Sequence, residues 1–180
     1  MARRQRRLDP LPEGSRALYV VMGVAGSGKS VIGAALARAL GVEFVEGDDF
    51  HSPRNVERMS SGIPLTDEDR ATWLSALAAR ISKARKAGKG LVVSCSALKR
   101  SYRDILRAEA GELQFIYLRG PRAVIVERIA QRRGHFMPPA LLDSQFDALQ
   151  VPSPEEQAWV MDIAKSPDEI IAALMARASV

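Results

Sequence analysis

Five short apolar segments along this chain alternate with stretches whose apolar residues recur at helical spacing. The apolar segments are residues 17–22, 42–46, 91–95, 113–118 and 159–163, and each has the length and composition of a buried strand. The helical stretches cover residues 31–40, 66–85, 98–109 and 121–133 and a segment that begins at Ser166. Strands that alternate with helices form a parallel sheet with right-handed crossovers. The pattern therefore predicts an α/β domain, with a five-stranded parallel sheet and helices on both faces.

Two of these helices have start signals. Thr66 and Asp69 have the spacing of a capping box, in which each side chain accepts a hydrogen bond from a backbone N–H group. Ser166, Pro167 and Glu169 have the same arrangement, with proline at the first helical position. We therefore expect helices to begin directly after Thr66 and Ser166.

The alternation is interrupted between residues 133 and 150. Gly134, Pro138 and Pro139 break the pattern there, before the last strand. Segments that close over a bound ligand are a common device in enzymes. We interpret residues 133–150 as a lid within a single domain that spans residues 16–180.

The composition fits a globular domain. Of the 180 residues, 47% are hydrophobic and 26% are charged, and no apolar stretch approaches the roughly 18 residues of a membrane span. Cys95 is the single cysteine, which excludes an internal disulfide and indicates a reducing compartment. These features predict a cytoplasmic protein with no membrane partner.

Positive charge is concentrated near the N-terminus. Residues 1–15 hold four arginines against two acidic residues, which accounts for +2 of the formal net charge of +5. Pro10, Pro12 and Gly14 follow the arginines, as is typical of a disordered, solvated leader. A weak contact with a polyanion is the alternative. The remaining charge is spread along the chain, so we expect no specific nucleic-acid partner.

A glycine-rich loop follows the first strand. Residues 23–30 match the pattern G-x-x-x-x-G-K-S/T, and a helical stretch comes directly after them. In this setting backbone N–H groups surround phosphates at the positive end of the new helix. Lys29 would reach the outer phosphates, and Ser30 would offer its hydroxyl to Mg²⁺. The candidate nucleotide-binding residues of the loop are Gly23, Val24, Ala25, Gly26, Ser27, Gly28, Lys29 and Ser30.

Two absences narrow the class of phosphate-binding protein. The sequence has no Asn/Thr-Lys-x-Asp segment after a late strand, which argues against guanine recognition. The strand at residues 91–95 does not end in the aspartate that commonly helps to hold Mg²⁺ in such proteins. We therefore expect Ser30, the nucleotide phosphates and water to hold the metal, with Glu46 or Asp48 in the surrounding shell.

Asp48 is the candidate general base. It follows the second strand at the edge of the sheet where ligands bind, and a carboxylate there can accept the proton of a substrate hydroxyl. The alternative is a structural role, in which Asp48 caps a helix that begins near Ser52.

Four strings of residues are more specific than the glycine-rich loop. They are Gly47-Asp48-x-x-His51, Asn55-Val56-x-Arg58-Met59 with the following segment to Leu74, Cys95-Ser96-Ala97-Leu98-Lys99 with Tyr102-Arg103-Asp104, and Gly134-His135-Phe136-Met137 with Ser144-Gln145-Phe146. These strings resemble the bacterial and eukaryotic gluconokinases. With the loop at residues 23–30, the resemblance covers roughly residues 18–165. This chain has Glu46 where family members often have aspartate, and Asp49 where an apolar residue is common.

The resemblance implies a specific activity and fold. The activity is ATP-dependent phosphorylation of D-gluconate at its 6-hydroxyl, and the products are 6-phospho-D-gluconate and ADP. This reaction would feed the pentose phosphate or the Entner-Doudoroff route. The implied fold is a P-loop NTPase of the nucleoside-monophosphate-kinase and shikimate-kinase type with a mobile lid, and the implied assembly is a homodimer.

D-gluconate, the substrate that the resemblance implies, carries a carboxylate and several hydroxyls, so its site needs cationic and polar side chains. Guanidinium groups match carboxylate oxygens bidentately, and we expect Arg103 in particular to bind the carboxylate. A solvated surface charge is the alternative for each cation. The candidate substrate-binding residues are Asp48, His51, Arg58, Arg70, Lys99 and Arg103.

Arg128 and Arg132 lie one helical turn apart and precede the predicted lid. By analogy with related kinases, Arg128 would stack near the adenine and Arg132 would neutralise charge on the transferred phosphate. A solvated basic helix face is the alternative. The candidate catalytic residues are therefore Lys29, Asp48 and Arg132.

Other functions remain open at this stage. A kinase for another small acceptor, such as shikimate or a nucleotide, would share the loop but need a different set of residues between positions 51 and 103. A nucleic-acid-associated ATPase would use the basic leader. A nucleotide sensor without enzymatic activity would have no need of acceptor-binding residues.

Overall fold

The computed structural model describes residues 16–131 and 138–178. The expected leader at residues 1–15 lies outside the described residues, as do Arg132, His135 and the rest of residues 132–137. The elements in chain order are β1 (Leu18–Met22), α1 (Lys29–Leu40), β2 (Glu43–Glu46), the 3-10 helix η1 (Gly47–Phe50), α2 (Pro53–Ser60), α3 (Asp67–Lys86), β3 (Leu91–Ser94), α4 (Arg100–Arg107), β4 (Gln114–Arg119), α5 (Arg122–Ala130), α6 (Pro139–Ala148), the 3-10 helix η2 (Pro154–Glu156), β5 (Trp159–Asp162) and α7 (Pro167–Ala178).

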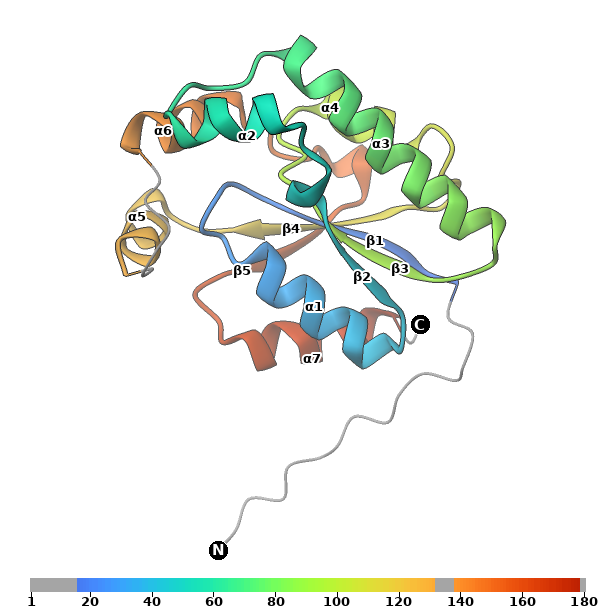
Figure 1. Cartoon of the computed structure of the whole chain (residues 1–180). Coiled ribbons are helices and arrows are strands. Elements are labelled where there is room, and N and C mark those ends of the chain that lie inside the picture. The colour runs from blue at the N-terminus through green and yellow to red at the C-terminus, as the bar shows by residue number, and fades with distance from the viewer. Residues whose placement is uncertain (1–15, 132–137, 179–180) are drawn as a thin grey trace, which may run out of the picture.

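The strands form the predicted five-stranded parallel sheet, in the order β2-β3-β1-β4-β5 (Figure 1). The central strand β1 places Val20 beside Val93 of β3 and beside Phe115 of β4. All the strand pairs are parallel, so their carboxyl ends meet at one edge of the sheet.

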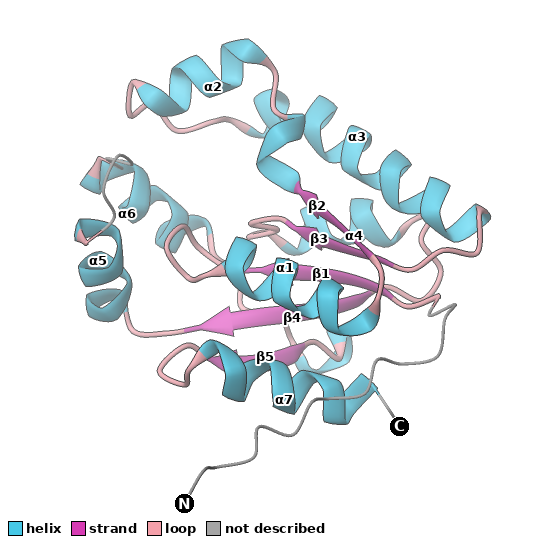
Figure 2. Ribbon diagram, turned by 60° about the horizontal axis from the view of Figure 1, so that its bottom comes forward, coloured by secondary structure: helices cyan, strands magenta, loops and turns pink. Residues whose placement is uncertain are grey.

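Alternation along β1 divides the core into two layers. Tyr19 and Val21 pack with the apolar residues of α1 and α7 on one face of the sheet. Leu18, Val20 and Met22 pack with α3 and α4 on the other face. Figure 2 shows the two pairs of helices on opposite sides of the strands. Because both faces are covered, the central strand β1 is apolar and buried along its whole length, as the sequence pattern indicated.

The predicted helix starts are confirmed. Thr66 and Asp69 form a reciprocal capping box at the start of α3. Glu169 and Ser166 likewise accept hydrogen bonds from each other's backbone N–H groups at the start of α7. The helix predicted at residues 98–109 is shorter, because residues 96–99 form a loop in which Ala97 has a positive φ of 44°.

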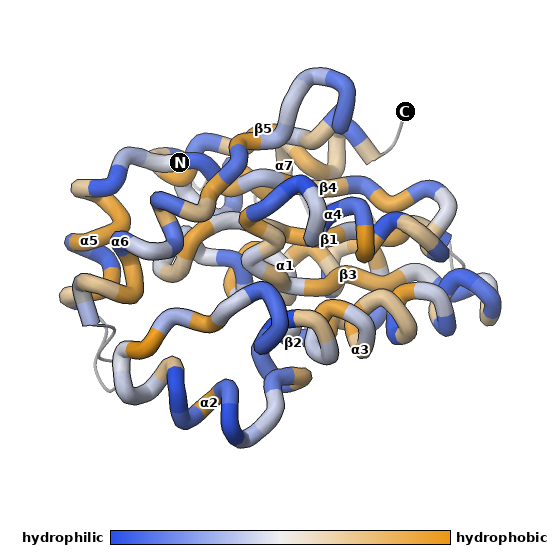
Figure 3. Tube along the Cα trace, turned by 90° about the horizontal axis from the view of Figure 1, so that it is seen from above, coloured by the Kyte–Doolittle hydropathy of each residue, from blue (hydrophilic) through white to orange (hydrophobic). Residues whose placement is uncertain are grey.

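Three helices gather beyond the carboxyl ends of the strands. α5 and α6 lie at that end of the sheet (Figure 1), and α2 forms a largely hydrophilic margin of the molecule (Figure 3). The sequence pattern did not resolve α6, yet Leu141 and Leu142 are 6% and 4% exposed and anchor it to the core. Gly62, after α2, approaches Pro138 at the start of α6. Among the helices that the structure describes, none is both long and apolar enough to span a membrane.

Candidate active site

A cleft of about 710 Å³ opens at the carboxyl ends of the strands. Its walls come from five segments that are far apart in the sequence: the glycine-rich loop, the β2–α2 segment, the start of α3, the β3–α4 loop, and α5 with α6. The predicted residues that line it are Ala25, Gly26, Gly28, Lys29, Ser30, Asp48, His51 and Arg70.

The glycine-rich loop presents open backbone donors to this cleft. Gly26 and Gly28 have φ values of 78° and 97°, a conformation that favours glycine. α1 begins at Lys29 with no side-chain cap and no acidic residue in its first turn. The N–H groups at a helix start lack intrahelical partners, so an uncapped, unopposed start is suited to an anion. The geometry of the loop thus fits the phosphates of a nucleotide.

Asp48 is held at the cleft by contacts of its neighbour, Gly47. The Gly47 N–H donates to Ser94 Oγ at 3.2 Å, and Trp73 Nε1 donates to the Gly47 carbonyl at 2.8 Å. A Cβ at Gly47 would lie 2.1 Å from the Ser94 carbonyl oxygen, so only glycine allows this approach. Ser94 also donates a short hydrogen bond to Glu46. These contacts fix the end of β2 against the end of β3, so that Asp48 lies at the cleft.

The structure excludes the alternative role of Asp48 as a helix cap. Ser52 caps α2, because its side chain accepts a hydrogen bond from the Asn55 N–H at 3.2 Å. The Asp48 side chain is therefore not needed to start this helix.

His51 carries a buried nitrogen with no protein partner. Its ring stacks on Trp73 with centroids 4.3 Å apart and an interplanar angle of 15°. Within the part of the chain that the structure describes, Nδ1 is buried and makes no hydrogen bond. Burial lowers the pKa of His51, Asp48 opposes this shift and Arg70 adds to it. The ring is therefore neutral near pH 7 and can accept or donate one hydrogen bond toward a ligand.

Arg70 is the predicted cation that the structure brings to the cleft beside His51. It donates to the Leu65 carbonyl at 2.6 Å and to the Tyr102 hydroxyl at 3.4 Å through one nitrogen, Nη1. These contacts orient the guanidinium, and its other two nitrogens make no hydrogen bond to the described residues.

Lys99 and Arg58 are not among the residues that line the cleft. Lys99 binds both carboxylate oxygens of Asp67, at 2.8 and 2.9 Å, and this hydrogen bonding raises the pKa of Lys99. Arg58 forms an ion pair with Asp69 at 3.4 Å. Arg58 and Lys99 thus connect the start of α3 to neighbouring elements in this structure.

Arg103 requires a correction, because the structure places it in the scaffold and not at the ligand. The residue is fully buried, and its Nε and Nη2 donate to the two carboxylate oxygens of Glu156 at 2.6 and 2.8 Å. Its Nη1 donates to the carbonyls of Ala97 and Leu98 at 3.0 and 3.2 Å. The bidentate geometry expected for a substrate carboxylate is used on a carboxylate of the protein itself.

The remaining predicted residues lie away from the cleft or outside the described chain. Arg128 donates to the Ile163 carbonyl at 2.6 Å and connects α5 to the segment after β5. Arg132 and His135 belong to residues 132–137, outside the described residues. Cys95 is buried, and burial raises its pKa to about 12, so it is unsuited to act as a thiolate.

Sequence reasoning did not single out three polar residues of the cleft: Ser60, Ser96 and Gln145. Gln145 of α6 lines it, and its Oε1 accepts a hydrogen bond from the Ala25 N–H at 2.7 Å. Gln145 stands inside a string that carries the family resemblance, which is the signal that could have singled it out.

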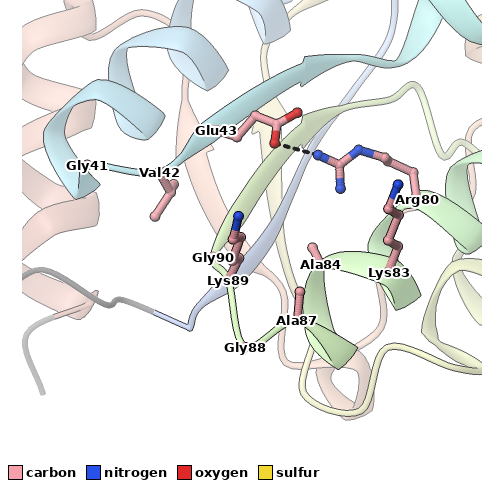
Figure 4. A pocket seen from close by; sticks show the side chains of 10 residues that line it. All are labelled: Gly41, Val42, Glu43, Arg80, Lys83, Ala84, Ala87, Gly88, Lys89 and Gly90. Carbon is pink, nitrogen blue, oxygen red and sulfur yellow. Dashed lines mark ion pairs between the residues drawn. The ribbon is translucent and has the colours of Figure 1, made fainter.

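A second hollow lies at the amino ends of β2 and β3 (Figure 4). It measures about 600 Å³ and has Arg80, Lys83 and Lys89 in its wall. Arg80 is paired with Glu43 at 2.5 Å, and the C-terminal ends of α1 and α3 point their negative dipole ends toward it. It lies at the opposite edge of the sheet from the glycine-rich loop and contains no such loop.

An open phosphate loop that faces a carboxylate, a neutral histidine and an arginine across one cleft defines a P-loop kinase of the small-molecule class. Comparisons with known proteins agree. A family model described as an AAA domain matches residues 18–152. The gluconokinase of Gluconobacter oxydans (strain 621H) is 44% identical over 156 residues, which are 87% of this chain and 88% of that protein. The chain belongs to the gluconokinase family.

Solved structures support the same assignment. A gluconokinase from Sinorhizobium meliloti 1021 is 48% identical with a TM-score of 0.80, and covers 87% of this chain and 88% of its own. A sugar kinase from Janibacter sp. HTCC2649 is 45% identical with a TM-score of 0.85. The match covers 89% of this chain and 92% of the sugar kinase chain. Shikimate kinase from Acinetobacter baumannii is 16% identical with a TM-score of 0.56, so it shows the fold alone.

Proposed function

We propose that this protein transfers the γ-phosphoryl group of ATP to the 6-hydroxyl of D-gluconate, giving 6-phospho-D-gluconate and ADP. The observation that carries the proposal is the single cleft in which the open start of α1 faces Asp48, His51 and Arg70. The gluconokinases among the relatives support the choice of acceptor. The distant likeness to shikimate kinase extends to the fold and lends no support to shikimate as acceptor.

ATP would bind with its phosphates on the loop at residues 23–30. The uncapped N–H groups at the start of α1 would face the β-phosphate, and Lys29 would contact the outer phosphates. Arg128, which lies beside the segment after β5, would border the adenine. Arg132 would neutralise charge on the transferred group, a role supported by its position one turn after Arg128 in the sequence.

The transfer would also require Mg²⁺, and the oxygen atoms of the cleft side chains fit this ion. Ser30, Glu46 and Asp48 offer oxygen atoms, and Mg²⁺ prefers oxygen ligands while keeping several waters. No group of three His, Cys, Asp or Glu side chains able to hold a metal occurs in residues 16–131 and 138–178. Bound there, Mg²⁺ would neutralise charge on the phosphates.

The transfer itself needs positioning more than covalent help from the protein. The 6-hydroxyl oxygen forms a bond to the γ-phosphorus as the bond to the β–γ bridging oxygen breaks, and ADP leaves with that electron pair. The hydroxyl proton passes to the Asp48 carboxylate. Arg70 and His51 hold the carboxylate and the other hydroxyls of gluconate in this proposal, while Lys99, Arg58 and Arg103 support the surrounding loops.

Three further features complete the proposal. Residues 133–150 would act as the cover of the nucleotide, which the position of α6 on the cleft supports. A homodimer is suggested by the resemblance to gluconokinases. A cytoplasmic location is supported by the single, buried cysteine, and neither a nucleic acid nor a membrane is proposed as a partner.

A coupled assay of ADP release tests the function. Purified full-length protein with ATP and Mg²⁺ is given D-gluconate, related sugar acids or shikimate. We expect gluconate-dependent ADP release, with phosphate on the 6-position by NMR of the product. Release that depends on another acceptor, or no acceptor-dependent release, would refute the proposal.

A further inference from the structure

We propose that Gln145 of α6 is a further catalytic residue, whose side-chain NH₂ group donates a hydrogen bond to the transferred phosphoryl group. This inference rests on the proposed kinase function and adds to it a residue from a helix that the sequence pattern did not resolve. It starts from the contact between Gln145 and the third residue of the glycine-rich loop, Ala25.

The direction of the Gln145 amide follows from its partner. The Ala25 N–H can only donate, so the side-chain atom 2.7 Å away must be the carbonyl oxygen Oε1. The NH₂ group is then the other arm of the same planar amide. Among the described residues it donates to no acceptor, although Gln145 lines the cleft. A half-buried donor of this kind is available to a ligand.

The two ends of the glycine-rich loop differ in the partners of their backbone N–H groups. Ala25, before the turn at Gly26, has its N–H bound by Gln145. At the other end α1 starts with no side-chain cap, which suits this helix start to a phosphate. Gln145 therefore binds the loop at Ala25 and leaves the start of α1, which is suited to the β-phosphate, accessible. Its side-chain NH₂ group lies next to the loop.

The helix that carries Gln145 is held on both sides. Leu141 and Leu142 bury it against the core, and the Gln150 N–H, two residues after its end, donates to the Leu98 carbonyl at 2.8 Å. A donor held in place before the reaction stabilises developing charge without reorganisation. The equatorial oxygens of a phosphoryl group in transfer carry such charge.

Two variants separate the donor role from a purely structural one. Gln145→Leu removes both arms of the amide. Gln145→Glu keeps an oxygen for the Ala25 N–H and removes the donor. We expect both to lower kcat by about 100-fold, the usual scale for one lost transition-state donor. We also expect the affinity for a non-hydrolysable ATP analogue, measured by calorimetry without acceptor, to fall relative to the affinity for ADP, while the affinity of Gln145→Leu for ADP stays within about twofold.

Gln114→Leu is the matched control. The Gln114 side-chain amide donates to the carbonyls of Phe115 and Gln157 at 2.9 and 3.0 Å, and Gln114 does not line the cleft. This variant loses amide hydrogen bonds elsewhere in the fold and should keep kcat. The proposal is overturned if Gln145→Glu keeps wild-type kcat, or if Gln145→Leu loses ADP affinity and melting temperature in step with kcat, because the residue would then only support the loop. A wild-type enzyme inactive on gluconate would instead refute the proposed function, and the comparison of ADP with the ATP analogue would still test Gln145.

Discussion

At the scale of single residues, Trp73 positions two residues on the acceptor side of the cleft, Asp48 and His51. Trp73 is 2% exposed, donates to the Gly47 carbonyl and stacks on His51. It therefore fixes the backbone just before Asp48 and the ring just after it. The chemistry proposed for Asp48 and His51 thus relies on this buried tryptophan.

Asp48→Asn should separate catalysis from nucleotide binding. The amide keeps the size of the side chain but cannot take the hydroxyl proton, so we expect kcat to fall at least ~100-fold. The affinity for ADP should stay near wild type, because the phosphate loop is unchanged. Steady-state kinetics and calorimetry measure both, and near-normal turnover would remove Asp48 from the mechanism.

His51→Phe tests the unpartnered nitrogen. Phenylalanine preserves the stack on Trp73 but has no ring nitrogen, so one hydrogen bond to the acceptor is lost. We expect the KM for gluconate to rise about 10-fold, which corresponds to roughly 1.4 kcal/mol, with the KM for ATP nearly unchanged. A parallel rise in both constants would show that His51 supports the fold of the cleft instead.

At the scale of elements, a buried ion pair, Arg103 with Glu156, is one of three ion pairs among the described residues that join α4 to η2. Glu156 has a side-chain exposure of 3% and binds Arg103, whose remaining donors hold the carbonyls of Ala97 and Leu98. The Ser96 carbonyl of the same loop accepts a hydrogen bond from the Gly23 N–H at 3.3 Å. The pair therefore supports the β3–α4 loop, which in turn contacts the start of the phosphate loop.

This pair should make stability depend on pH in acid. The Arg103 hydrogen bonds lower the pKa of Glu156 from 4.5 to about 2. Because the folded-state pKa is the lower one, the ionised carboxylate stabilises the fold above about pH 4.5, and this contribution is lost as the pH falls toward 2. We expect the pair to account for about 2 to 3 kcal/mol of the loss in unfolding free energy between about pH 5 and about pH 2.5.

The double variant Arg103→Met with Glu156→Gln provides the comparison. It removes both charges together and so leaves no unpaired buried ion. Urea titrations at the two pH values should show a smaller loss for this variant than for wild type. Equal losses would mean that Glu156 titrates normally in the folded protein.

At the scale of the whole molecule, the candidate active site lies at one edge of the sheet. The two core layers pack α1 and α7 on one face and α3 and α4 on the other, and the cleft lies where the strands end. The described residues begin at Arg16, two positions before the start of β1. The four arginines of residues 1–15 precede it in the sequence.

Deleting residues 1–15 tests whether the basic leader takes part in function. None of the residues proposed to bind ATP or gluconate lies in it, so we expect kcat and both KM values to stay within about twofold of wild type. The rival ATPase interpretation expects weaker binding to a polyanion such as heparin and a loss of any ATPase activity that the polyanion stimulates. The kinetic constants and the response to heparin are both measured for the wild type and for the variant that lacks residues 1–15.

The sequence by itself determined the five strands, the helices α1, α3, α4, α5 and α7, and the phosphate loop. Strand and helix periodicity, the capping residues and the loop at residues 23–30 are local signals, because each depends on residues close together in the chain. They were enough to predict the parallel sheet and to place Lys29, Ser30 and Asp48 at its ligand-binding edge, which the structure confirms as one cleft.

Only the tertiary structure decided which charged side chains have the protein as their partner. In the sequence, Arg103 and Arg70 are both arginines within family strings, but Arg103 meets Glu156, 53 positions away, while Arg70 reaches the cleft. Gln145 likewise meets Ala25 across 120 positions. Such pairs form when the chain folds several distant segments onto one edge of the sheet, and no local spacing encodes them.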